Sequence, residues 1–186
     1  MVTNGEITKG ISTLYDTINQ IIEEARAAVY RTANITMVRA YWHIGRVIVE
    51  DEQKGKERAE YGKQVLKQLS QKLTKKHGRG FDESNLRHMR NFYLVYPKCD
   101  ALRPELSWTH YRLLLKVGNE QARLFYMQET IDCNWSTRTL ERQIGNLYYE
   151  RMLMSHNTQI VKDEAAEKEI RQEPKDIIKD PYVLEF

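Results

Sequence analysis

The chain has 186 residues, of which 41% are hydrophobic and 30% charged, and its formal net charge is +3 at pH 7. This length accommodates one ordinary globular domain with tails, and the small number of glycines and prolines favours helices. Two cysteines, Cys99 and Cys133, form neither a disulfide framework nor a metal-binding spacing. No basic flank precedes an apolar run at the N-terminus and no window approaches about eighteen apolar residues, so we expect a cytoplasmic protein with no signal peptide or membrane span.

The N-terminal part of the chain carries an apolar heptad pattern. Its steps alternate four and three residues through Ile7, Ile11, Leu14, Ile18, Ile21, Ala25, Ala28, Thr32 and Ile35. The pattern predicts a long helix that continues to Ile48, a rod of roughly 60 Å. A rod of this length packs across a whole helical bundle or against a second copy of the chain, so a homodimer is one expectation. Gly45, within the run YWHIGRVI, is expected to permit a close helix crossing.

The middle of the chain is predicted to form a helix, a tight turn and a second helix. Apolar residues at helical spacing give each helix one buried side, made by Val65, Leu66, Leu69 and Leu73 in the first and by Leu86, Met89, Tyr93 and Tyr96 in the second. Gly78 and Gly80 suit the left-handed conformation that ends a helix. Asp82 or Ser84 is expected to cap the second helix.

The exposed side of this helix pair is basic. Residues 61–98 hold nine Lys and Arg against two acids, a net charge of +7, so the rest of the chain sums to −4. The side chains expected to face a DNA groove are Ser84, Arg87, His88 and Asn91, with Arg90 at the edge, and those expected to hold phosphates are Lys72, Lys75, Lys76 and Arg79. Such a second helix suits a helix-turn-helix that contacts duplex DNA. The alternative is a packing unit whose basic side is simply solvated.

The remaining chain is predicted to close the domain with a helical hairpin. Ser107 and Asn119 are expected to cap two helices, and Ser136 to open a last helix that runs to Arg151. Four residues of this last helix are expected to face inward, namely Leu140, Ile144, Leu147 and Tyr148. This hairpin is a second helix-turn-helix-like pair, for which we favour a packing role.

The predicted fold is all-α, with a long N-terminal helix, a helix-turn-helix core and a closing helical hairpin over residues 6–154. Residues 155–186 become acidic and contain two prolines, which indicates a weak helix followed by a charged linker.

No group of residues predicts a catalytic site, a metal site or a cofactor. The five histidines are scattered without Cys or acid partners at ligand spacing. Glu-x-Lys tripeptides occur at Glu52-Gln53-Lys54 and Glu173-Pro174-Lys175, but in charged surroundings that do not suggest strands. Metal-dependent cleavage of nucleic acid needs an Asp and a Glu that converge on Mg²⁺. We therefore expect no enzymatic activity from this chain by itself.

Five motifs, taken together and in order, resemble the N-terminal domain of the YhcG-like PD-(D/E)XK nuclease family. They are YWHIGRVI, YGKQVLKQLSQKL, GRGFDESNLRHMRNFYLVYP, LSWTHYRLLLKV and NWSTRTLERQIGNLYYERM. The resemblance covers about residues 10–155, and the ending DPYVLEF is similar to the family's joint to a C-terminal nuclease domain. It implies a helical domain that targets a nuclease to DNA, with the metal-binding carboxylates in the other half of the parent protein. The alternative is a protein-interaction or dimerisation domain that works through the heptad helix.

Overall fold

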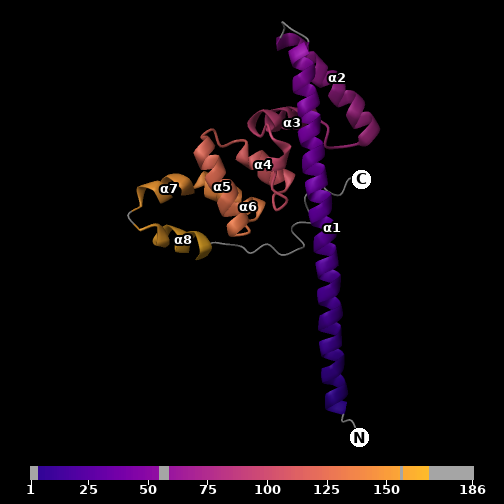
Figure 1. The fold of residues 1–186 in the computed structure, drawn as a ribbon, viewed down its shortest axis with the longest axis vertical. Helices are drawn as coiled ribbons and strands as arrows, with labels where there is room; N and C mark the ends of the chain where they lie inside the picture. Colours follow the sequence, from indigo (N-terminus) through magenta and orange to yellow (C-terminus); the bar gives the residue numbers. More distant parts are fainter. Residues whose placement is uncertain (1–3, 55–58, 156, 168–186) are drawn as a thin grey trace.

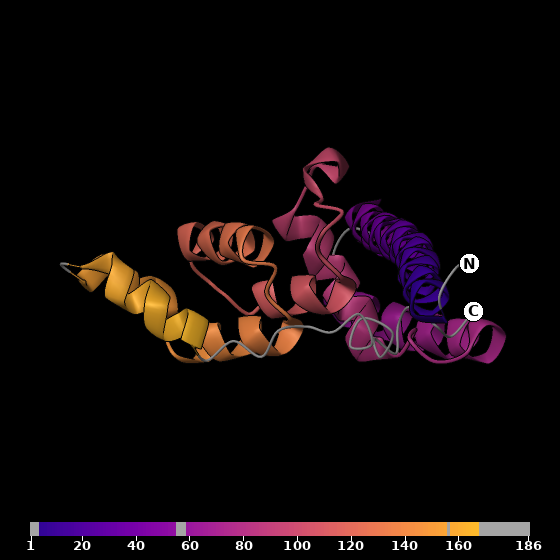
Figure 2. The same cartoon turned by 90° about the horizontal axis from the view of Figure 1, so that it is seen from below.

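The structure is a computed structural model that describes residues 4–54, 59–155 and 157–167. Within these ranges the chain forms eight α-helices and one short 3-10 helix, and no strand, which confirms the all-α prediction. Helix α1 (Asn4–Lys54) is a single rod, and the other helices gather beside its C-terminal half (Figure 1). A view from below shows these helices spread sideways from the rod (Figure 2).

The two halves of α1 have different surroundings. Its C-terminal half buries Val38, Tyr41, Trp42, Ile48 and Val49. Its N-terminal half stands clear of the other labelled helices in Figure 1, and every side chain from 11 to 26 is exposed. The predicted long helix is confirmed, and its 51 residues extend further than expected, to about 77 Å. From Ile11 to Val29, however, the apolar heptad stripe is exposed and is not covered by any described helix of this chain.

Gly45 marks the place where α1 crosses α3 (Glu83–Val95). A Cβ atom at Gly45 would lie 2.0 Å from the carbonyl oxygen of Met89 and 3.2 Å from the Cβ of Tyr93. Beside this crossing the indole N–H of Trp42 donates to the Tyr96 carbonyl at 2.6 Å. The prediction that Gly45 permits a close helix crossing is confirmed.

Helix α2 (Ala59–His77) is joined to α3 by a tight turn. Gly78 and Gly80 in this turn have φ angles of 81° and 98°, in the left-handed region that glycine adopts most readily. The carboxylate of Asp82 accepts a hydrogen bond from the Asn85 backbone N–H at 3.0 Å and so caps α3. Of the two predicted caps, Asp82 is the one used, and Ser84 lies inside the first turn of α3.

The core is centred where α1, α3 and α4 (Trp108–Leu114) meet. The ring of Trp108 lies 5.0 Å from that of Tyr41 and 5.3 Å from that of Phe92, measured between centroids. Its indole N–H donates to Oδ1 of the buried Asn85 at 3.0 Å, and the Asn85 amide donates to the Gly80 carbonyl. A buried amide is costly unless it is hydrogen-bonded, so Asn85 ties the turn before α3 to the core. The predicted apolar side of α3 omitted both Asn85 and Phe92.

The predicted caps in the C-terminal half are confirmed. The side chains of Ser107, Asn119 and Ser136 each accept a hydrogen bond from the backbone N–H three residues later. They begin α4, α5 (Glu120–Asp132) and α6 (Thr137–Gly145). A 3-10 helix (Cys99–Ala101) lies in the connection between α3 and α4.

The prediction of one helix from Ser136 to Arg151 is wrong. Helix α6 ends at Gly145, Leu147 has a left-handed φ of 52°, and α7 (Tyr148–Met154) follows. Leu147 is 58% exposed and not inward-facing as expected. The hydroxyl of Tyr126 on α5 stabilises the break, because it donates to the Gln143 carbonyl at 3.4 Å and accepts from the Tyr149 N–H at 3.1 Å.

The last described helix, α8 (Thr158–Glu167), lies in the first part of the predicted linker. The tripeptide Glu173-Pro174-Lys175 and the ending DPYVLEF lie outside the described residues. Across the helices that the structure describes, none combines the length and the apolar character needed to cross a membrane.

His110 is a buried polar group at the start of α4, with 6% of its surface exposed. The Ser107 backbone N–H donates to Nδ1 at 3.1 Å, so the proton resides on Nε2, which lies 3.1 Å from the Trp135 carbonyl and donates to it. Burial lowers the pKa of His110 to about 4, although the hydrogen bond to Trp135 opposes part of this shift. The ring is therefore held in its neutral form.

We expect His110 to make the folded state less stable in acid. The unfolded chain takes up a proton near the ordinary pKa of 6.5, whereas the folded ring does so only near pH 4. The contribution of neutral His110 to the free energy of unfolding is thus fully present above pH 6.5. It is lost as the pH falls from 6.5 to about 4, and the loss amounts to at most about 3 kcal/mol. Urea denaturation of the wild type and of His110→Gln at a series of pH values measures this, because the variant lacks the titrating group. A pH dependence that is identical in both proteins would contradict it.

Candidate nucleic-acid interface

The predicted phosphate-contacting residues lie at the C-terminal end of α2 and in the turn that follows. Lys72, Lys75, Lys76 and Arg79 are all exposed. Two of them, Lys75 and Lys76, belong to the last turn of α2. Cations in the last turn of a helix are also favoured by the helix dipole. Their position therefore has a local structural benefit, in addition to any role in binding an anion.

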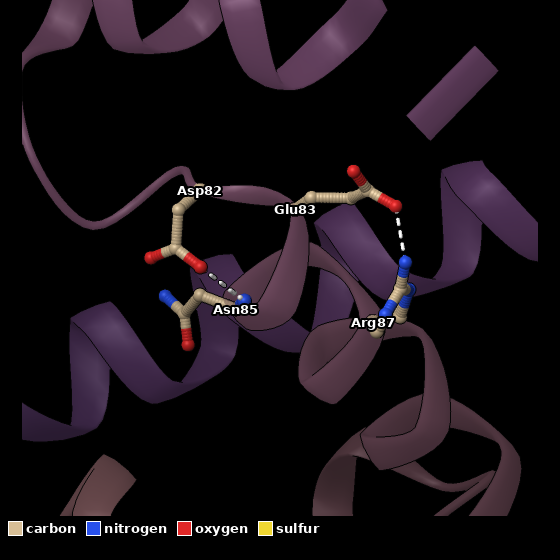
Figure 3. A network of polar contacts seen from close by, with 4 residues as sticks. All are labelled: Asp82, Glu83, Asn85 and Arg87. Atoms are coloured by element: carbon tan, nitrogen blue, oxygen red, sulfur yellow. Dashed lines mark hydrogen bonds and ion pairs between the residues drawn. The ribbon is translucent and has the colours of Figure 1, made fainter. Parts of the chain in front are cut away.

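The α3 residues predicted to face a groove share the side of that helix away from α1. Ser84, Arg87 and Asn91 are exposed, and His88 is half-buried. Arg87 forms an ion pair with Glu83, one turn earlier on the same helix (Figure 3). An exposed pair with this spacing contributes little to stability. The Arg87 guanidinium can therefore exchange Glu83 for another anion at small cost.

Arg90 has a different environment from the other predicted residues. Its Nε donates to both carboxylate oxygens of Glu52 on α1, at 3.0 and 2.7 Å. The pair is half-buried and links α3 to α1. The carboxylate of the first Glu-x-Lys tripeptide is thus engaged in this link, and the predicted contact of Arg90 with DNA remains a prediction.

His88 lies on α3 close enough to α4, and to the turn after it, for their charges to act on its ring. Burial lowers the pKa of His88, and the positive charges of Arg112 and Lys116 lower it further, while Asp82 raises it. The imidazole is therefore neutral at pH 7 and has one donor and one acceptor nitrogen. The influence of Arg112 and Lys116 indicates that the basic surface continues beyond α3.

Arg112 and Lys116 are absent from the predicted site, although the sequence holds part of the signal. Residues four apart lie on the same side of a helix, so their spacing places the two cations together. Only the packing of α4 beside α3 shows that this side lies near His88. Among the residues that the structure describes, no three His, Cys, Asp or Glu side chains gather in a way that could hold a metal ion.

Comparison with known proteins places this helical, basic domain in a family. Residues 17–151 match the DUF1016 N-terminal domain, and the chain belongs to this family. Among its relatives is "Putative nuclease YhcG" of Escherichia coli (strain K12), which is 37% identical to it over 211 residues, covering 96% of this chain and 56% of that protein. The chain thus spans little more than half the length of this relative. No solved structure matches it. The resemblance to the YhcG-like family is confirmed, and the domain is a nuclease-associated one.

Proposed function

We propose that this domain binds duplex DNA and positions it for the nuclease domain of a YhcG-like protein. The observation that carries the proposal is the run of exposed cations at the end of α2, in the turn, and on the outer side of α3. Neutralisation of phosphates by Lys and Arg releases condensed counterions, which supplies essentially all of the non-specific affinity of a protein for DNA. The related protein is named a "putative nuclease", so nucleic acid is the polyanion to test first.

In this proposal the basic residues have two roles. Lys72, Lys75, Lys76 and Arg79 contact phosphates and fix the position of the duplex without reading its sequence. Arg87 leaves Glu83 and reaches a base edge, with Ser84, His88 and Asn91 beside it on the same side of α3. Arg90 lies at the edge of this surface, where its pair with Glu52 holds α3 on α1.

The two roles predict different effects of substitution. Arg87→Ala should cost about 1–3 kcal/mol of binding free energy and relax preference at one position of the duplex. Lys75→Ala and Lys76→Ala should weaken binding to all duplexes alike, and each should lower the dependence of log K on log salt by about one unit. Fluorescence anisotropy with duplexes of different sequence measures both effects. The matched control is Arg26→Ala, which removes an exposed cation from the N-terminal half of α1. The control should bind like the wild type, and binding that is also unchanged in Arg87→Ala, Lys75→Ala and Lys76→Ala would contradict the proposal.

Self-association through α1 is the second candidate function, and the exposed heptad stripe favours it. Apolar residues occupy the a and d positions at Ile11, Leu14, Ile18, Ile21, Ala25 and Ala28, and a third position of each heptad at Tyr15, Ile22 and Val29. With three apolar residues in every seven, the stripe is as wide as that of a helix that packs in a bundle. The charged residues from 11 to 29 are Asp16, Glu23, Glu24 and Arg26, and none lies at these positions. We propose that a second copy of this chain covers the stripe.

A further inference from the structure

A basic hollow lies between α4 and α6. Its volume is about 210 Å³, well above the roughly 10–15 Å³ that a cavity needs to hold one water molecule. The polar side chains that line it are Thr109, Arg112 and Lys116 from α4 and the turn after it, and Thr137, Arg138 and Glu141 from α6. Three cations, two hydroxyl groups and one carboxylate thus converge from two helices that are separate in sequence.

The charge balance of the hollow suits an anion. Glu141 is its acidic member, and its carboxylate lies 3.9 Å from the Lys116 Nζ. Both side chains of this pair are about two-thirds exposed. The ion pair therefore contributes little to stability and can open at small cost. The hydroxyl of Thr137 can donate a hydrogen bond to an anion. Arg138 is exposed at the first turn of α6, where the helix dipole also favours negative charge.

The hollow adjoins the outer side of α3. Arg112 and Lys116 act electrostatically on His88, which lies between Arg87 and Asn91 in the sequence of α3. A duplex that contacts α3 would therefore bring its backbone towards the hollow. A DNA backbone supplies a negatively charged phosphodiester every few ångströms, which matches a site with several donors and an excess of positive charge.

We propose that the hollow between α4 and α6 binds one backbone phosphate of the same nucleic acid that α3 contacts. Arg112, Lys116 and Arg138 neutralise the phosphate, and Thr137 donates a hydrogen bond to it. This inference rests on the proposed DNA-binding function and enlarges its surface beyond the predicted helix-turn-helix. The second helix-turn-helix-like pair, for which a packing role was expected, would then contribute a direct contact through Arg138.

The test uses a double variant that combines Lys116→Gln and Arg138→Gln. Its binding to duplex DNA is compared with that of the wild-type chain at several salt concentrations. Both side chains are exposed, so the variant is expected to fold, and far-UV circular dichroism checks this. Loss of one phosphate contact should weaken binding about tenfold or more. It should also lower the slope of log K against log salt by about 0.9, equally for all sequences. Arg138→Lys, which keeps the charge, should retain the slope of the wild type.

Two controls separate failure of this site from failure of the proposed function. Arg26→Gln removes one exposed cation far from the hollow and should leave the slope unchanged. If the hollow variant behaves like Arg26→Gln while Lys75→Ala still lowers the slope, the hollow is only a solvated surface and the DNA-binding function stands. If the wild type binds no duplex at low salt, the proposed function fails and the site with it. Inorganic phosphate at millimolar concentration should compete for the hollow, and so should narrow the difference between the wild type and the double variant.

Discussion

Gly45→Ala is expected to destabilise the folded protein by about 3 kcal/mol or more. The added Cβ atom would lie 2.0 Å from the Met89 carbonyl oxygen, a backbone atom that no rotamer change can move. Either α1 and α3 separate, or the backbone of α3 shifts within the packed core, and overpacking of this kind usually costs about 1–3 kcal/mol and occasionally more. The free energy of unfolding, measured by urea denaturation, tests this expectation.

The matched control is Gly145→Ala in the last turn of α6. No heavy atom lies within 4 Å of the position that its Cβ would take. This substitution should change the free energy of unfolding by less than about 1 kcal/mol, and alanine has the better helix propensity. Equal losses of stability in the two variants would show that the α1–α3 crossing is not the close contact described above.

The second large effect is expected from Ile18→Glu combined with Ile21→Glu. Both isoleucines lie on the apolar stripe of α1, and each is about half exposed or more in the single chain. If a second copy covers the stripe, two carboxylates in that dry contact would abolish association. Light scattering should then show an oligomer for the wild type and a monomer for the variant. The C-terminal half of α1 and the helices packed on it should keep their fold in the variant.

A control for this experiment places the same charge on the other side of α1. Thr13→Glu combined with Gln20→Glu adds two carboxylates outside the a and d positions and should leave the oligomer intact. A wild-type chain that is monomeric at high concentration would contradict self-association. The apolar stripe would then need a different partner.

The local features of the fold were predictable because they are encoded by neighbouring residues. The caps at Asp82, Ser107, Asn119 and Ser136, and the left-handed glycines before α3, depend on hydrogen bonds within three residues or on the absence of a Cβ atom. The break at Leu147 was not predictable in this way. It depends on the Tyr126 hydroxyl, which comes from another helix, and an apolar leucine continues the helical pattern.

Tertiary packing also explains what the sequence could not show about the site. The spacing of apolar residues placed Arg87 and Asn91 on the outer side of α3, where the structure has them exposed. It gave no indication that Arg90 pairs with Glu52, because the partners lie 38 residues apart. The position of Arg112 and Lys116 near His88 likewise depends on how α4 packs. The heptad pattern predicted the helix but not whether its stripe would be covered within the chain.

Duplex DNA binding by the wild-type chain as a function of salt tests the central claim most directly. Four or five phosphate contacts, from the end of α2, the turn and the hollow, predict that log K falls with log salt with a slope of about −4. Affinity should therefore decrease on the order of a hundredfold between about 50 and 200 mM salt. No binding at the lower concentration, or binding whose affinity does not change with salt, would contradict the account.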